Sequence, residues 1–161
     1  MAEVALTTLL DCSPVEAWGW VRAPALLQHV SHPLIRFTPD RGNLLPEVWE
    51  PGEYRLWLHL FGRIPLGWQA VVITFPEPSQ TTRFMRDNGY SPSIRRWDHW
   101  IEIAPASGGK TRYTDRVTIE AGWRTPLVAA FARQLYAHRQ RRWRALARSG
   151  FAALDLPGSA A

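Results

Sequence analysis

Polar and apolar side chains alternate along residues 53–61, with an apolar residue at every even position from 54 to 60. A period of two predicts a β-strand with one buried face, because successive side chains point to opposite sides of a strand. Further strands are predicted over residues 68–75, 81–86, 94–103 and 111–120, joined by turns at residues 62–67, 76–79, 88–93 and 104–109. Connections this short favour antiparallel neighbours, so the middle of the chain is expected to form an antiparallel sheet.

Helix-start signals precede these strands. Ser13 can cap a helix, Pro14 suits its first position, and Glu16 stands at the capping-box position, so a short helix is expected to begin here and end near residue 21. The flanking elements are a strand over residues 3–10 and a second short helix over residues 25–29.

The longest helix is expected after the last strand. Pro126 suits its first turn and Gly150 ends it, which gives a helix over about residues 127–149. Its apolar stripe consists of Val128, Phe131, Leu135 and Leu146. A long amphipathic helix after an antiparallel sheet with one apolar face predicts an α+β fold in which the sheet wraps the helix.

Hairpin geometry assigns the strand side chains to faces, because opposed residues in an antiparallel pair have a constant index sum. The turns near residues 108 and 90 place His99 opposite Asp115 and Phe84 opposite Trp97. Continuing through the earlier turns places Val71 opposite Phe84. One face is then almost wholly apolar: Leu56, Leu58, Leu60, Val71, Ile73, Phe75, Phe84, Trp97, His99, Ile101, Tyr113, Asp115, Val117 and Ile119. The other face is polar but rich in tryptophan, which is typical of a solvated face and also of a self-association patch.

The composition predicts one domain over residues 1–150 and a short tail over residues 151–161. Hydrophobic residues make up 46% of the 161 residues, which is enough for a sizeable core. Nine tryptophans indicate a roomy aromatic cavity or aromatic surface contacts. Cys12 is the only cysteine, so no internal disulfide can form, and no apolar run reaches the roughly 20 residues of a membrane span. A cytoplasmic protein without an integral membrane span is expected, as a monomer or homodimer.

The net charge is +5, and all basic residues except Lys110 are arginine. The basic run over residues 139–148 is interpreted as a solvated helix end, since no nucleic-acid motif accompanies it. His29 and His32 have no acidic or cysteine neighbours suited to a metal. No nucleic acid, metal or cofactor is therefore expected.

Several short motifs follow one another in the order of a known family. Residues 12–18 (CSPVEAW) begin the first helix, Leu45 and Gly52 precede a strand, residues 64–68 (IPLGW) lead into the next, Trp97-Asp98-His99 lies on a central strand, and Asp115 lies on the last. This order, over roughly residues 4–146, resembles the START-like helix-grip (SRPBCC) superfamily, and within it the bacterial polyketide cyclase/dehydrase-like proteins. A second histidine that many members carry two places after the first is replaced by Ile101.

The resemblance implies a cavity between the sheet and the long helix that holds a small hydrophobic molecule such as a lipid, polyketide or quinone. The residues expected to line it are Leu56, Leu58, Leu60, Val71, Ile73, Phe84, Trp97, His99, Ile101, Tyr113, Asp115, Phe131, Leu135 and Arg139. A binding or transfer protein is the preferred interpretation.

Two other functions stay open. His99 and Asp115 are candidate catalytic residues of a cyclase or dehydratase, because a carboxylate beside an imidazole tunes it for proton transfer. The same pair is equally compatible with a structural contact. The third possibility is a non-catalytic interaction module that uses the tryptophan-rich face. Arg139 is interpreted as snorkelling to water rather than as a contact for a ligand carboxylate or phosphate.

Overall fold

The computed structural model describes residues 1–40 and 43–154 of the chain and confirms the predicted α+β helix-grip fold. Its elements are, in order, β1 (Ala2–Leu10), α1 (Pro14–Val21), α2 (Pro24–Ser31), β2 (Ile35–Pro39), β3 (Gly52–Leu60), β4 (Ile64–Thr74), β5 (Arg83–Ser91), β6 (Ile94–Pro105), β7 (Thr111–Glu120) and α3 (Thr125–Arg148), with single 3₁₀ turns at Ser107–Gly109 and Gly122–Arg124.

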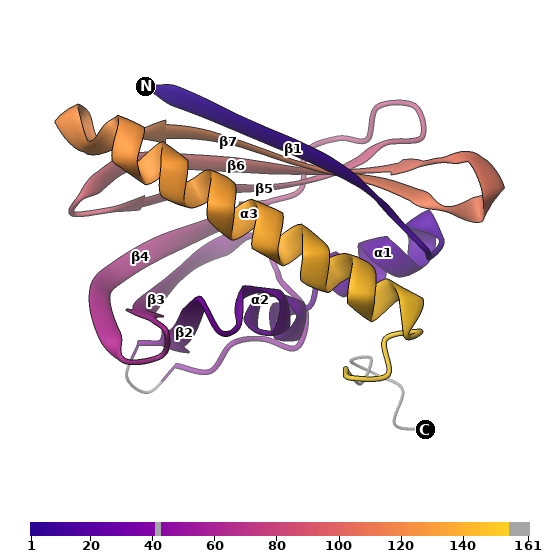
Figure 1. Cartoon of the computed structure of the whole chain (residues 1–161), viewed down its shortest axis with the longest axis horizontal. Coiled ribbons are helices and arrows are strands. Elements are labelled where there is room, and N and C mark those ends of the chain that lie inside the picture. Colours follow the sequence, from indigo (N-terminus) through magenta and orange to yellow (C-terminus); the bar gives the residue numbers. More distant parts are fainter. Residues whose placement is uncertain (41–42, 155–161) are drawn as a thin grey trace.

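The strands form one antiparallel seven-stranded sheet in the order β1-β7-β6-β5-β4-β3-β2. The sheet curves, and α3 crosses its concave side diagonally, with α1 and α2 beneath the second half of α3 (Figure 1). No helix in the described ranges is long and apolar enough to cross a membrane.

The start of α1 follows the predicted capping. The Oγ of Ser13 accepts the backbone N–H of Glu16 at 3.2 Å, and Pro14 occupies the first helical turn. Such a cap contributes about 1 kcal/mol to the stability of the helix and sets the residue at which α1 begins.

Buried residues form two apolar clusters beside α3. One lies along β1, β6, β7 and the first half of α3 and includes Val4, Val117 and Tyr136. The other joins α1, α2, β3 and the second half of α3, where Trp20 and Trp143 are almost fully buried. Phe151 stacks on Trp20 at 4.9 Å between ring centroids and is 3% exposed, so the core extends past Gly150. Residues 155–161 of the predicted tail lie outside the described residues.

The predicted pairing of β6 with β7 was wrong by two residues. His99 lies opposite Val117, and Asp115 lies opposite Ile101. A shift of two keeps every side chain on its face, because side chains alternate with a period of two. His99 and Asp115 therefore still share the concave face, as diagonal rather than direct neighbours.

The predicted pairing of β5 was wrong by an odd number of residues, and this reversed its faces. Trp97 lies opposite Gly89 rather than Phe84, and Ile73 lies opposite Asp87. Phe84 therefore lies on the convex face, where its ring contacts Trp100 at 6.2 Å between centroids. The inner positions of β5 belong to Met85, Asp87 and Gly89.

The error arose at Asn88-Gly89, which was interpreted as part of a turn. These residues lie inside β5, and the turn lies at Pro92-Ser93. Gly89 is required by packing, because a Cβ there would lie 2.6 Å from the carbonyl oxygen of Ala70 on β4. Two further differences concern β2, which was not predicted, and β4, which begins at Ile64 inside the predicted turn.

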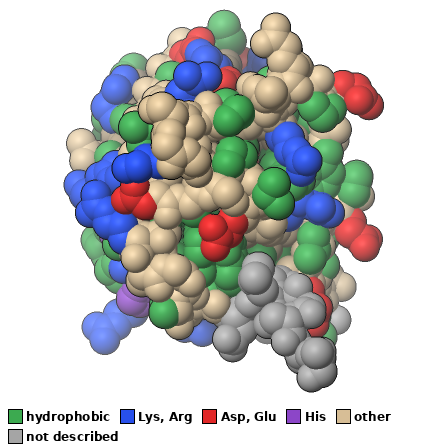
Figure 2. Space-filling view, turned by 90° about the vertical axis from the view of Figure 1, so that its right-hand side faces the viewer, with side chains coloured by type: hydrophobic (Ala, Val, Ile, Leu, Met, Phe, Trp, Pro, Cys, Tyr) green, Lys and Arg blue, Asp and Glu red, His purple; other side chains and the backbone are tan. Residues whose placement is uncertain are grey.

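Arginine and tryptophan side chains stack on the convex face of the sheet. The Cζ of Arg55 lies 4.4 Å from the ring centroid of Trp68, and the Cζ of Arg86 lies 5.0 Å from that of Trp100. Such cation–π contacts cover the rings with charged groups. On the side of the molecule seen in Figure 2, apolar side chains are likewise interspersed with basic ones.

Candidate functional site

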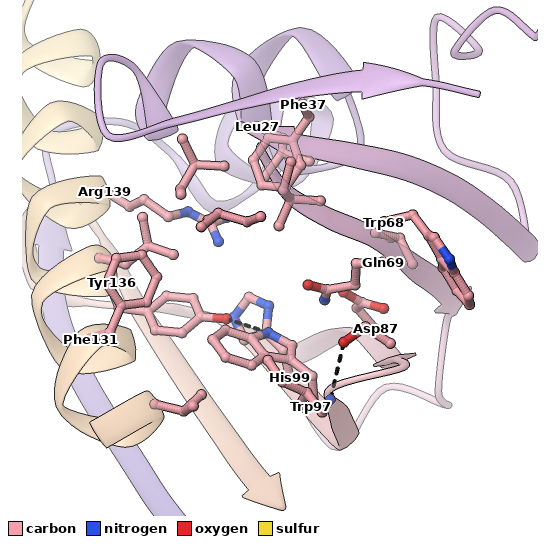
Figure 3. Close-up of a pocket in the computed structure, with 18 of the residues that line it drawn as sticks. Leu27, Phe37, Trp68, Gln69, Asp87, Trp97, His99, Phe131, Tyr136 and Arg139 are labelled. Carbon is pink, nitrogen blue, oxygen red and sulfur yellow. Dashed lines mark hydrogen bonds between the residues drawn. The ribbon is translucent and has the colours of Figure 1, made fainter. Parts of the chain in front are cut away.

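A pocket of about 530 Å³ lies between the concave face of the sheet and α3. Most of its wall is apolar and comes from α2, β2–β6 and α3 (Figure 3). The pocket opens between the start of β4 and the start of α3, where the lining residues Leu66, Leu127 and Phe131 are exposed. Single-chain proteins rarely keep an apolar space of this size unless it serves binding.

Most of the predicted lining residues face this pocket. They are Leu58, Leu60, Val71, Ile73, Trp97, His99, Ile101, Tyr113, Phe131, Leu135 and Arg139. The other three do not line it. Leu56 is fully buried in the core, Phe84 lies on the convex face, and Asp115 lies behind His99.

Sequence reasoning missed Asp87, Gln69 and Tyr136, which supply polar groups to the pocket wall. Asp87 was missed because of the wrong register in β5. Tyr136 falls four residues after Ala132 and eight after Val128, a helical spacing that could have revealed it. Gln69 points toward Asp87 across the sheet in Figure 3.

Asp115 is the centre of a buried hydrogen-bond network. Its carboxylate accepts the Nε2–H of His99 at 2.8 Å, the hydroxyl of Tyr113 at 2.8 Å, and the amide of Gln140 at 2.9 Å. Burial raises the pKa of Asp115, but these donors and the field of Arg139 outweigh it and leave the pKa below its ordinary value. Asp115 is therefore an ionised acceptor.

This network fixes the tautomer of His99. Because an ionised carboxylate only accepts hydrogen bonds, Nε2 of His99 must carry the proton that it donates. Burial lowers the pKa of His99 despite the neighbouring carboxylate, which favours the neutral ring. In neutral His99 the Nδ1 atom is an acceptor, and within the described residues it makes no hydrogen bond. A donor on a ligand could therefore bind there.

Tyr136 connects α3 to the strand that carries His99. Its hydroxyl accepts the indole N–H of Trp97 at 3.1 Å, and its ring centroid lies 4.7 Å from that of His99 (Figure 3). Burial raises the pKa of Tyr136 above its ordinary value, so the hydroxyl keeps its proton. These contacts hold the wall of the pocket in place.

Asp87 lies directly across the strand pair from His99. Its Oδ1 accepts the backbone N–H of Val72 at 2.8 Å. Burial raises its pKa to about 7, although Arg139 acts in the opposite direction. The pocket therefore contains a carboxyl group that can exchange a proton near neutral pH.

Arg139 extends from α3 into the pocket rather than to water (Figure 3). Its Nε atom is buried without a hydrogen-bond partner, so the predicted snorkelling was wrong. Its Cζ lies 5.1 Å from the ring centroid of Tyr136.

Several solved structures share this fold at low sequence identity. A START superfamily protein from Mycobacterium smegmatis has a TM-score of 0.58 and 14% identity, covering 91% of this chain and 97% of that one. A protein from Thermus thermophilus has a TM-score of 0.62 and 10% identity, covering 92% and 99%. The Aha1 dimer from Colwellia psychrerythraea has a TM-score of 0.60 and 10% identity, covering 93% and 98%. These likenesses establish the START-like fold.

Comparison with curated protein sequences gave no match. A family model described as a domain of unknown function, DUF8410, matches residues 8–147. This range runs from the end of β1 to the last turn of α3 and so includes every element that lines the pocket. The chain has the START-like fold and belongs to the DUF8410 family.

Proposed function

We propose that this protein binds a small hydrophobic molecule in the pocket between the sheet and α3, as a binding or transfer protein. The observation that carries the proposal is an apolar pocket of about 530 Å³ that the protein's own side chains leave unfilled. An apolar wall with a few polar groups is what a site for a small organic ligand needs. Asp87, His99 and Arg139 are such groups.

The volume limits the size of the ligand. A water molecule takes up about 30 Å³ of liquid, so the pocket corresponds to roughly 18 non-hydrogen atoms. A medium-length acyl chain or a molecule of two to three fused rings fits this size. A whole two-chain phospholipid does not fit inside without part of it extending from the mouth.

Fluorescence titration with N-phenyl-1-naphthylamine, an uncharged apolar dye of suitable size, tests the proposal. The dye is expected to brighten on binding, and Val71→Trp on the pocket wall should abolish this signal by filling the space. Val72→Trp is the matched control, since the adjacent side chain points to the convex face. If Val71→Trp does not fold, Leu58→Trp replaces it. Equal dye binding by wild type and folded pocket variants would contradict the proposal.

A cyclase or dehydratase activity is the second candidate, favoured by the 2.8 Å hydrogen bond between His99 and Asp115. In this alternative the Nδ1 of neutral His99 accepts a proton from the ligand, and Asp115 stabilises the resulting imidazolium. Mass spectrometry of molecules extracted from purified wild type and His99→Ala discriminates the two functions. A dehydratase should leave the variant enriched in a form that is heavier by one water, whereas a binding protein should yield the same masses from both.

A further inference from the structure

Arg139 differs from its neighbours Arg142 and Arg144 on α3 in having no hydrogen-bond partner. Arg142 donates to the backbone oxygen of His29 at 2.8 Å, and Arg144 donates to Thr8 Oγ1 at 2.8 Å. Among the described residues, Arg139 makes no hydrogen bond and no ion pair, and its Nε atom is enclosed. A guanidinium without an acceptor is costly inside a protein, because nothing replaces the water that it has lost.

The nearby carboxylates do not supply the missing acceptor. Asp115 is occupied by His99, Tyr113 and Gln140, and Asp87 is held by the Val72 amide. Burial lowers the pKa of Arg139, but Tyr113, Tyr136 and the field of these two carboxylates outweigh it and leave the pKa above its ordinary value. The guanidinium is thus a fixed positive charge on a mostly apolar wall.

We propose that the pocket selects hydrophobic monocarboxylic acids, whose carboxylate pairs with Arg139 while the apolar part lies against the surrounding wall. This inference rests on the proposed function. A planar guanidinium matches a carboxylate through two parallel hydrogen bonds, and between mostly apolar walls such a charged pair is stronger than at an open surface.

The surroundings of Arg139 favour a single negative charge on the ligand. A phosphate monoester carries up to two charges, whereas Arg139 is one cation, with Asp87 and Asp115 close enough to repel a second negative charge. The stacking of Arg139 on the Tyr136 ring fixes its direction, so little side-chain freedom is lost when the acid binds.

Competition against bound N-phenyl-1-naphthylamine tests this selectivity. Dodecanoate and dodecanol have nearly the same apolar chain and differ in charge. At about pH 8, dodecanoate should displace the dye from wild type at a concentration about 10- to 100-fold lower than dodecanol. Arg139→Met should remove this preference by weakening dodecanoate, with dodecanol changed by less than about threefold. Arg133→Met removes a charge from the exposed face of the same helix and should behave as wild type.

The outcomes separate the two proposals. If wild type does not bind the dye, both the proposed function and the proposed selectivity for acids are wrong. If the dye and dodecanol bind but dodecanoate has no advantage, or keeps its advantage in Arg139→Met, the acid selectivity alone is wrong. Tighter binding of dodecyl phosphate than of dodecanoate would also overturn the monocarboxylate class. Should Arg139→Met unfold, Arg139→Gln keeps a polar side chain without the charge and gives the same test.

Discussion

Replacing Asp87 by asparagine is expected to stabilise the protein at neutral and alkaline pH. Asp87 is held on the pocket wall by the Val72 amide at 2.8 Å, and burial raises its pKa to about 7. An asparagine keeps an oxygen acceptor for that amide and cannot ionise. The variant therefore removes the cost of a buried carboxylate while it preserves the hydrogen bond.

The size and the pH range of the effect follow from the shift. An aspartate in an unfolded chain has a pKa near 3.9, so folding raises the pKa of Asp87 by about 3 units, equivalent to about 4 kcal/mol. Because the folded state holds the proton more tightly, the wild type loses stability as the pH rises from about 4 to 7, and the loss is complete above that range. Water at the pocket mouth screens part of this cost, so a gain of about 2–4 kcal/mol is expected for Asp87→Asn near pH 8.

Urea unfolding monitored by tryptophan fluorescence at about pH 4.5, 6 and 8 measures this gain. Asp98→Asn is the control, because Asp98 pairs with Arg86 at 2.8 Å and Arg96 at 2.7 Å, which hold its pKa below the ordinary value despite burial. That variant should be destabilised at the same pH values at which Asp87→Asn is stabilised. A difference between wild type and Asp87→Asn that stays constant from pH 4.5 to 8 would refute the reasoning.

Four further substitutions are expected to change the free energy of unfolding, measured in urea near pH 7. Asp115→Asn should cost about 3 kcal/mol, because three buried donors lose a charged acceptor; a cost below about 1 kcal/mol would contradict the network. Gly89→Ala should cost about 1–3 kcal/mol through its clash at 2.6 Å with the Ala70 carbonyl oxygen, whereas Gly19→Ala in α1, where a Cβ meets nothing within 4 Å, should gain about 0.5–1 kcal/mol. Phe151→Ala should cost about 3 kcal/mol or more, and an unchanged midpoint would show that the chain after Gly150 does not stabilise the core.

The sequence was most informative where a pattern is long and periodic. The helix predicted over residues 127–149 spans Thr125–Arg148, and the strand predicted over residues 111–120 has the same bounds in the structure. The face of His99 was also predicted, although the residue opposite it on β7 was not, because an even error in register leaves faces unchanged.

The prediction failed where glycine can serve either of two purposes, a turn or the close approach of two strands. Gly89 follows Asn88 and was interpreted as a turn, but it serves the close approach of β5 to β4. This register error on β5 wrongly assigned Phe84 to the pocket face and Asp87 to the convex face. β2 was missed because five residues with two apolar side chains give too short an alternation to stand out.

The role of Arg139 could not be predicted from helical spacing alone. A position on the apolar stripe of the helix shows only that the side chain leaves the helix on its inner face. Whether the charged group reaches water depends on the distance between α3 and the sheet. The structure holds α3 away from β3 and β4 while packing it closely on β1, and this separation creates the pocket that keeps the guanidinium inside.

A crystal structure of the protein grown with N-phenyl-1-naphthylamine tests the central claim most directly. The account predicts that the dye lies between α3 and the concave face of the sheet, in contact with Val71, Ile101 and Leu135, with the backbones of helix and sheet unmoved. A structure in which α3 lies closer to β3 and β4, so that these side chains meet one another and the dye binds elsewhere or not at all, would contradict it.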